Sequence, residues 1–344
     1  MPDFNPSHFL STWPQQNPYP TNNDFQTFIT KIFSLPQNDT YIYLTQNTGV
    51  TLSQVQQHIN YGSVNGLCTW YYDSTNSQRA VPTPSEIEAY NTIFFPGTST
   101  PKSLKNLSSN AKKGSLRAEI GEYLNANYTP PPAGLTVPKT KHVNPYLDVW
   151  IWTNRFLLWA GPEPGTVRVR HSHAILPVLY HHFGCVCPSF EALEVIRVLA
   201  RGRRVIDLGS GGGYWSFMLR ERGLNVVAVD SGESEWRFMW VSDTVVCEGE
   251  RWLKRNGGVE DVLLMVYPIV GQGFTERMVR AFRGTTIITA GTQNASGFTG
   301  FGEQTMAEWM EKETKGWKKL LQIPLPSFAG RDEALFVFEK GGRG

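Results

Sequence analysis

A glycine-rich stretch in the second half of the chain constrains the fold more than any other feature of the sequence. Residues 205–215 read Val-Ile-Asp-Leu-Gly-Ser-Gly-Gly-Gly-Tyr-Trp, so a short apolar run leads through Gly209, Gly211 and Gly213 into a helical pattern. Glycines at these positions allow a tight turn and leave no Cβ between the backbone and a ligand. Amide groups at the start of the helix can then bind an anionic group. The stretch predicts a strand, a turn and a helix that together hold a ligand.

The segments around this stretch alternate between apolar runs of strand length and segments of helical period. The expected strands are 204–208, 225–230, 244–247, 262–267 and 285–290, followed by a hairpin of 320–325 and 334–339. The expected helices are 190–200, 214–222, 274–282 and 305–317. Strands that are apolar on both faces and separated by helices are typical of a parallel sheet with helices on both sides. The sequence therefore predicts an α/β fold.

The glycine spacing separates two ligand classes. A dinucleotide fingerprint of the form G-x-G-x-x-G needs glycine at position 214, where this chain has Tyr214. The spacing G-x-G-x-G, with Asp207 two positions before Gly209 and Asp230 ending the next apolar run, resembles instead the class I S-adenosylmethionine-dependent methyltransferases. That resemblance spans residues 188–340 and implies a Rossmann-like class I methyltransferase fold, with a mostly parallel seven-stranded sheet whose last strand is antiparallel.

The resemblance also implies the cofactor S-adenosyl-L-methionine and a set of residues that contact it. In that family the glycine loop wraps the methionine part, and an acidic residue at the end of the second strand binds the ribose hydroxyls, here Asp230. An acidic residue near the adenine is expected after the third strand, where Glu248 and Asp243 are rival candidates. The predicted cofactor-binding residues are Asp207, Gly209, Ser210, Gly211, Gly213, Tyr214, Asp230, Ser231, Glu248 and Tyr267.

The sequence says less about the methyl acceptor than about the cofactor. Tyr267-Pro268 keeps part of a pattern that amino-directed methyltransferases place after the fourth strand, which makes Tyr267 a catalytic candidate. Several segments, among them residues 325–334, also resemble a group of fungal methyltransferase-like proteins, and that resemblance implies no particular substrate. Residues Asp332 and Glu333, in the expected final hairpin, are interpreted as a solvated turn.

Residues 144–187 are predicted to form a cap over the active site. Within the cap, His171 and His173 are candidate general bases, since an imidazole titrates near neutral pH. Arg168 and Arg170 could hold a carboxylate of the substrate in bidentate fashion. Ordinary structural hydrogen bonding is the competing interpretation for all four. Two more substrate candidates follow the fifth strand, Gln293 and Asn294, where a plain connecting loop is the alternative.

Histidines and cysteines between residues 171 and 187 lack the spacing of a zinc site, so no metal is predicted. The 32 basic and 30 acidic residues leave a net charge of +2, which makes nucleic acid an unfavoured partner. The longest apolar run, residues 262–270, is too short to span a membrane. Four cysteines in 344 residues are typical of a reduced, cytoplasmic protein, with a nuclear location left open.

Residues 1–143 differ in composition from the rest of the chain. The first hundred are rich in Asn, Gln, Ser, Thr and Pro but carry many aromatic side chains, and residues 101–142 form a more basic, Pro-containing strap. This composition predicts a partly folded appendage that could dock a protein partner. Two functions fit the whole chain: a methyltransferase, with a small-molecule acceptor favoured, or a non-catalytic module that has kept the cofactor fold.

Overall fold

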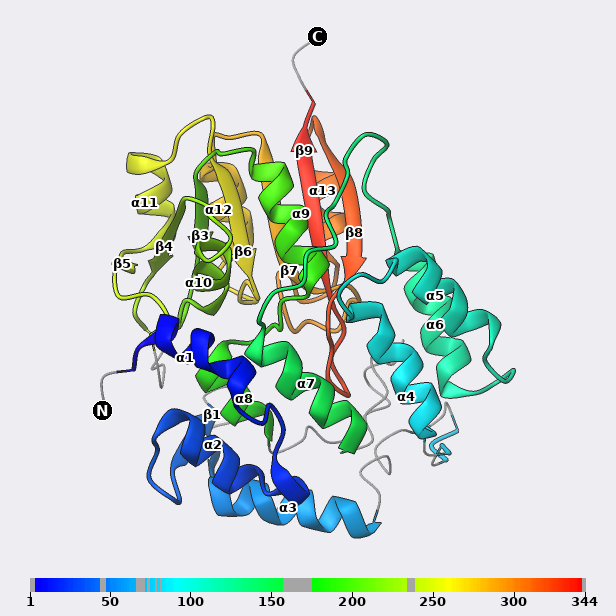
Figure 1. The fold of residues 1–344 in the computed structure, drawn as a ribbon. Coiled ribbons are helices and arrows are strands. Elements are labelled where there is room, and N and C mark those ends of the chain that lie inside the picture. The colour runs from blue at the N-terminus through cyan, green and yellow to red at the C-terminus, as the bar shows by residue number, and fades with distance from the viewer. Residues whose placement is uncertain are drawn as a thin grey trace.

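The structure is a computed structural model, and it describes residues 4–43, 48–65, 72, 75–77, 79–80, 82–156, 175–233 and 239–341. Its centre is a seven-stranded sheet in the order β5-β4-β3-β6-β7-β9-β8 (Figure 1). The strands are β3 (Val205–Leu208), β4 (Val226–Asp230), β5 (Val245–Val246), β6 (Val262–Val266), β7 (Thr286–Thr292), β8 (Trp317–Pro324) and β9 (Glu333–Lys340).

The direction of the strands confirms the predicted fold class. β3 pairs in parallel with β4 and β6, β4 with β5, and β6 with β7. β9 inserts between β7 and β8 and runs antiparallel to both. The sheet is thus mostly parallel with one reversed strand at the end of the chain, as the resemblance implied.

Helices cover both faces of this sheet because its central strands are apolar on both sides. On one face lie α9 (Phe190–Ala200) and α10 (Tyr214–Arg220), whose buried side chains belong to the larger core cluster. On the other face lie α11 (Gly249–Asn256), α12 (Phe274–Ala281) and α13 (Met306–Glu313), which form a second cluster. Sequence analysis predicted four of these helices and missed α11.

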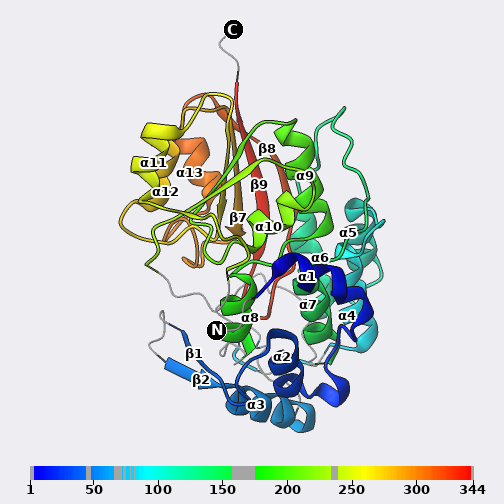
Figure 2. The same ribbon diagram turned by 60° about the vertical axis from the view of Figure 1, so that its left-hand side comes forward.

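The chain before α9 is mainly helical. Its helices are α1 (Pro6–Thr12), η1 (Trp13–Gln15), η2 (Thr21–Asn23), α2 (Phe25–Phe33), α3 (Leu52–Asn65), α4 (Pro84–Asn91), η5 (Thr92–Phe94), α5 (Thr100–Ser109), α6 (Leu116–Asn127), α7 (Pro145–Phe156) and α8 (Ile175–Phe183). A hairpin of β1 (Thr40–Tyr43) and β2 (Thr48–Thr51) lies beside α8 (Figure 2). Half of the predicted strap is therefore helical, since α5 and α6 fall within it.

Helices α1, α7 and α8 lie at the carboxyl ends of the parallel strands, whereas α6 lies beside the edge strand β8 (Figure 1). The last residue of β7, Thr292, pairs with the first of β9, Glu333, and Figure 1 shows this end of the sheet directed toward α1, α7 and α8. Aromatic residues of α1 and α2, among them Phe9 and Phe33, belong to the same core cluster as α9 and α10. The N-terminal residues therefore share the core of the α/β fold, which makes them more folded than the expected appendage.

The connection between β8 and β9 corrects one interpretation of the sequence. Asp332 and Glu333 were expected in a solvated turn, but they are only 1% and 3% exposed. The Tyr90 hydroxyl of α4 accepts a hydrogen bond from the backbone of Ser327 in this connection. The final hairpin is therefore a buried part of the carboxyl edge. In the described part of the chain, no helix combines the length and apolarity needed to cross a membrane.

Candidate functional site

The glycine-rich loop follows β3 at the point where the order of the strands reverses. β4 continues the chain on one side of β3, whereas β6 returns on the other, and ligands of open α/β sheets bind at such a switch point. Gly209, Gly211 and Gly213 all have positive φ angles, of 72°, 55° and 80°. Residues with a Cβ are strained in this region, so the backbone path itself explains the three glycines.

Asp230 at the end of β4 lies directly on this loop. One oxygen of its carboxylate accepts a hydrogen bond from the amide of Gly211 at 2.9 Å, and the other accepts from the amide of Gly232 at 2.8 Å. A carboxylate has about four acceptor positions, so each oxygen keeps capacity for a further donor. The structure thus brings together the loop and the strand-ending carboxylate that the sequence placed 21 positions apart.

A second carboxylate lies beneath the loop. Asp207 in β3 is buried, and one of its oxygens accepts a hydrogen bond from the Ser216 hydroxyl of α10 at 2.7 Å. Within the described residues, its other oxygen has no hydrogen-bond partner, and neither has the buried hydroxyl of Ser210 in the loop. Burial raises the pKa of Asp207 to about 6. Two unsatisfied polar atoms beside a glycine loop are suited to a ligand that carries a cationic donor.

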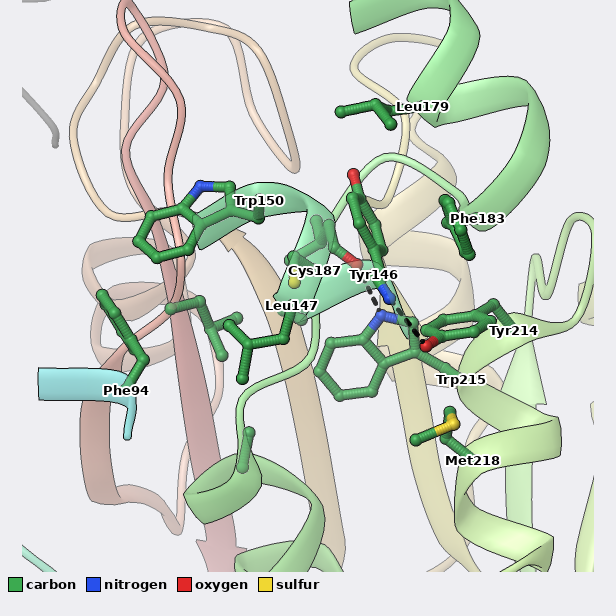
Figure 3. Packing of buried hydrophobic residues seen from close by; sticks show 14 of the residues in the cluster. Phe94, Tyr146, Leu147, Trp150, Leu179, Phe183, Cys187, Tyr214, Trp215 and Met218 are labelled. Atoms are coloured by element: carbon green, nitrogen blue, oxygen red, sulfur yellow. Dashed lines mark hydrogen bonds between the residues drawn. The ribbon is translucent and has the colours of Figure 1, made fainter. Parts of the chain in front are cut away.

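The side chains of the two residues after the loop are buried and bonded to structural partners. The hydroxyl of Tyr214 donates to Asn144 at 3.0 Å and accepts from the amide of Tyr146 at 3.3 Å. The indole of Trp215 donates to the carbonyl of Val186 at 2.8 Å. Figure 3 shows both rings packed beneath α7. Trp215 is therefore a core residue, and a cofactor contact by Tyr214, which stays a prediction, would fall to its backbone.

The candidates for a contact with an adenine already have structural partners. Glu248 caps α11 by accepting from the amide of Arg251 at 2.8 Å, and its rival Asp243 forms an ion pair with Arg220 at 2.7 Å. Ser231 is exposed directly after β4. The amide of Cys247 donates to the carbonyl of Asp230 at 2.8 Å, which holds the segment leading to Glu248 beside β4. Glu248 is therefore the residue after the one that contacts β4, whereas Asp243 is paired with Arg220 of α10.

Tyr267, directly after β6, has an unusual backbone conformation. Its φ angle is 53°, in the left-handed region, which costs a tyrosine on the order of 1–2 kcal/mol. Its hydroxyl accepts from the Arg331 guanidinium at 3.5 Å, and this guanidinium lies 4.2 Å from the centre of the Phe298 ring. These contacts bring together residues from three connections at the carboxyl edge: the one after β6, the one after β7, and the one between β8 and β9. Arg331 was not predicted as a site residue, and a lone arginine in a loop gives no signal for it.

Gln293 is held in a buried network. Its side-chain amide donates to Asp332 at 2.7 Å, and its oxygen accepts from Gln322 at 3.1 Å. Burial raises the pKa of Asp332 to about 6 and that of Glu333 to about 8. A contact between Gln293 and an acceptor stays a prediction and would require one of these bonds to break. The oxygen of Asn294 accepts from the amide of Ser296 at 3.1 Å, in the loop that continues toward Phe298.

Four predicted residues lie outside the described part of the chain: Arg168, Arg170, His171 and His173. Among the residues that the structure does describe, no group of three or more His, Cys, Asp or Glu side chains could hold a metal ion. Sequence analysis missed Ser216, the partner of Asp207. The signal for it was a small polar residue inside the otherwise apolar run of α10.

Comparison with known proteins adds similarities of fold. No family model matches the chain, and no curated protein matches its sequence. Among solved structures, the 1,6-didemethyltoxoflavin-N1-methyltransferase of Burkholderia thailandensis is similar at 17% identity over 42% of this chain and 74% of that one, with a TM-score of 0.32. The tRNA (uracil-54, C5)-methyltransferase of Pyrococcus abyssi is similar at 14% identity over 44% of this chain and 38% of that one, with a TM-score of 0.30.

A methyltransferase from Agrobacterium tumefaciens that depends on S-adenosylmethionine is similar at 14% identity over 41% of this chain and 56% of that one, with a TM-score of 0.27. The resemblance to fungal methyltransferase-like proteins is not supported by these comparisons. The assignment of the fold therefore rests on the order and direction of the strands, and the site rests on its own geometry.

Proposed function

We propose that the protein is a methyltransferase that uses S-adenosyl-L-methionine. The observation that carries this proposal is the hydrogen bond from the Gly211 amide to the Asp230 carboxylate, at the switch point of the sheet. It places an acceptor for two hydroxyl groups directly beside a loop in which all residues of 209–213 except Ser210 lack a Cβ. A nucleoside attached to a compact charged group matches this site, because its ribose supplies the two hydroxyl groups and its charged group can lie against the loop.

The residues present fit such a cofactor. The remaining acceptor positions of Asp230 suit the ribose hydroxyls. The partnerless oxygen of Asp207 and the hydroxyl of Ser210 suit the ammonium group of the methionine part. Ser231, Glu248 and the exposed Val246 on β5 would border the adenine. When bound, the cofactor would supply an electrophilic methyl group on a sulfonium, so the protein's main tasks are to align a nucleophile and exclude water.

For the acceptor we propose a small molecule with an apolar body. Ile269, Val270 and Phe298 are exposed on the connections that follow β6 and β7, and the two connections are joined by the bond from the Gly300 amide to the Pro268 carbonyl at 2.8 Å. The N-terminal helices lie across the same edge of the sheet (Figure 1). An edge covered in this way favours a small acceptor over the surface of a macromolecule.

The proposal assigns proton transfer to a residue near this edge. Tyr267, His171 and His173 are the candidates, and they act only where the nucleophile arrives protonated. Arg168 and Arg170 are proposed to bind a carboxylate of the acceptor, with Asn294 and Gln293 at the rim. These roles rest on the position of the residues in the sequence, and in the case of Tyr267 also on its strained backbone at the end of β6.

Two measurements test the proposal in sequence. Isothermal titration with S-adenosylhomocysteine should give one site per chain, and absence of binding would overturn the assignment of the cofactor. The protein is then incubated with methyl-labelled cofactor and a whole-cell extract, and the labelled small molecules and macromolecules are separated by chromatography. Binding without any transfer to small molecules or macromolecules would favour the non-catalytic module.

A further inference from the structure

Trp240 connects the glycine loop to the N-terminal part of the molecule. Its backbone amide donates to the carbonyl of Gly212 in the loop at 2.7 Å. The next residue, Val241, packs so closely on Gly213 that a Cβ added there would lie 2.5 Å from a methyl group of Val241. The segment around Trp240 therefore holds the loop through one hydrogen bond and one tight contact.

The indole of Trp240 is surrounded by aromatic rings from three helices. Phe4, which precedes α1, and Phe9, which lies in α1, meet the indole edge to face with ring centres 5.0 and 5.5 Å away. Phe183 of α8 stacks on it at 5.7 Å, and Tyr214 of α10 contacts it at 4.7 Å. Rings at these separations attract one another beyond their burial of apolar surface. Phe217 of α10 lies 5.4 Å away, so two of these five rings come from the first ten residues of the chain.

A chain of hydrogen bonds reaches Trp240 from the β1 strand. The hydroxyl of Tyr41 bonds to the ring nitrogen Nε2 of His182 at 2.8 Å. The backbone carbonyl of His182 accepts from the indole nitrogen of Trp240 at 2.6 Å. Tyr41, His182 and Trp240 are all buried, and buried bonds of this kind are costly to break because no water replaces them. The N-terminal residues thus contact the Trp240 ring directly and reach its indole nitrogen through His182.

We infer that the N-terminal segment 4–43 is part of the cofactor site, and that Phe9, Tyr41 and Trp240 are positioning residues for the glycine loop. The inference rests on the proposed function. The loop is rich in glycine, which loses more conformational freedom on ordering than any other residue, so the contacts around the loop decide how well its conformation is held. A loop that is already in its binding conformation binds more tightly, because less ordering accompanies binding. Loosening Trp240 should therefore weaken cofactor binding without removing any group that touches the cofactor.

A matched pair of variants separates this role from ordinary core packing. Phe9 and Phe28 are similarly buried, at 6% and 8% exposure, and both lie in the N-terminal helices. Phe9 contacts Trp240, whereas Phe28 packs on Trp13 and Phe25. Phe9→Leu and Phe28→Leu should lower the melting temperature by similar amounts. Only Phe9→Leu should weaken binding of S-adenosylhomocysteine, by about 2- to 30-fold, the range found for residues that act through others.

A second readout needs no ligand. Hydrogen exchange of the Trp240 amide reports opening of its bond to Gly212, and it should be faster in Phe9→Leu and in Tyr41→Phe than in Phe28→Leu. Trp240→Phe keeps a ring but removes the indole donor, and it should also weaken binding. If wild-type protein binds no S-adenosylhomocysteine, the proposed function fails while the exchange experiment still tests the coupling. Equal exchange and equal affinity in Phe9→Leu and Phe28→Leu would overturn the inference.

Discussion

Asp230 and Gly211 are joined by a hydrogen bond of 2.9 Å between the carboxylate of one strand end and the backbone amide of the neighbouring loop. The bond fixes the carboxylate against the loop, because the other oxygen is held in the same way by the amide of Gly232. Both amides are donors, so the site is built for an ionised acceptor at this position. An amide side chain could accept only one of the two bonds.

Asp230→Asn should therefore weaken binding of S-adenosylhomocysteine strongly. Hydrogen bonds to a charged group contribute about 1.5–3 kcal/mol, which corresponds to a loss of affinity of about 10- to 150-fold. Isothermal titration measures this loss. Asp243→Asn is the control, because Asp243 pairs with Arg220 on the exposed side of the same region. If Asp230→Asn binds like wild type, the ribose assignment is wrong.

Gly213→Ala tests whether the loop is held by its contact with Val241. Gly213 and Gly223 have nearly equal φ angles, 80° and 79°, but a Cβ has free space at Gly223 and meets Val241 at Gly213. Gly223→Ala should cost the strain alone, about 1–2 kcal/mol. Gly213→Ala should cost about 1–3 kcal/mol more through overpacking. Chemical denaturation of both variants measures the difference.

Val241→Ala in the Gly213→Ala background supplies the internal check. Removing the methyl groups of Val241 opens the space that the added Cβ needs, so the two substitutions together should cost less than the sum of their separate effects. Strict additivity in the double variant would show that the contact with Val241 does not constrain the loop.

The sheet and its flanking helices could be predicted because each is encoded locally. Nearly continuous apolar runs define β3, β4 and β6, and Gly209 and Gly232 mark where the first two of these runs turn. α11 was missed because its segment is rich in charged residues, and only Trp252 and Leu253 are buried. Asp207, Gly211 and Asp230 could be placed together for the same reason, since the parallel order of β3 and β4 brings their ends side by side.

The N-terminal layer could not be predicted, because what stabilises it is distant in sequence. The contact of Phe9 with Trp240 joins residues more than two hundred positions apart, and no local pattern encodes it. The polar composition of the first hundred residues also hides the buried aromatic stripe of α2. Asp332 was assigned to solvent for a related reason. Its partners Tyr123 and Gln293 come from elsewhere in the chain and replace the water that the carboxylate would otherwise need.

Asp207 should make stability depend on pH. Burial raises its pKa from 3.8 to about 6, so the folded protein retains this proton over a range in which the unfolded chain has released it. The stabilising contribution is complete below pH 3.8 and is lost as the pH rises through about 6. The melting temperature of Asp207→Asn relative to wild type should therefore rise between pH 4 and about 6 and stay level above about pH 7.

The same variant should bind S-adenosylhomocysteine more weakly, because it removes the negative charge proposed to meet the ammonium group. Asp243→Asn is again the control. Its pairing with Arg220 lowers the pKa of Asp243, so its contribution changes below pH 3.8 and its melting temperature relative to wild type should be flat above about pH 5. A flat difference for Asp207→Asn as well would show that this carboxyl group is not buried as described.

Tyr123→Phe tests the buried network that closes the carboxyl edge. The Tyr123 hydroxyl donates to Asp332 at 2.6 Å, and burial accounts for most of the raised pKa of Asp332. Without this donor the bond from Gln293 is the one side-chain bond that the buried carboxyl keeps among the described residues, and losing a partner of a buried polar group costs about 1–3 kcal/mol. Tyr61→Phe, at a site that is 73% exposed, should change stability by less than about 0.5 kcal/mol. Urea denaturation of the two variants measures the contrast. Equal stabilities would mean that Asp332 is hydrated in solution and that the edge beneath the acceptor site is open to water.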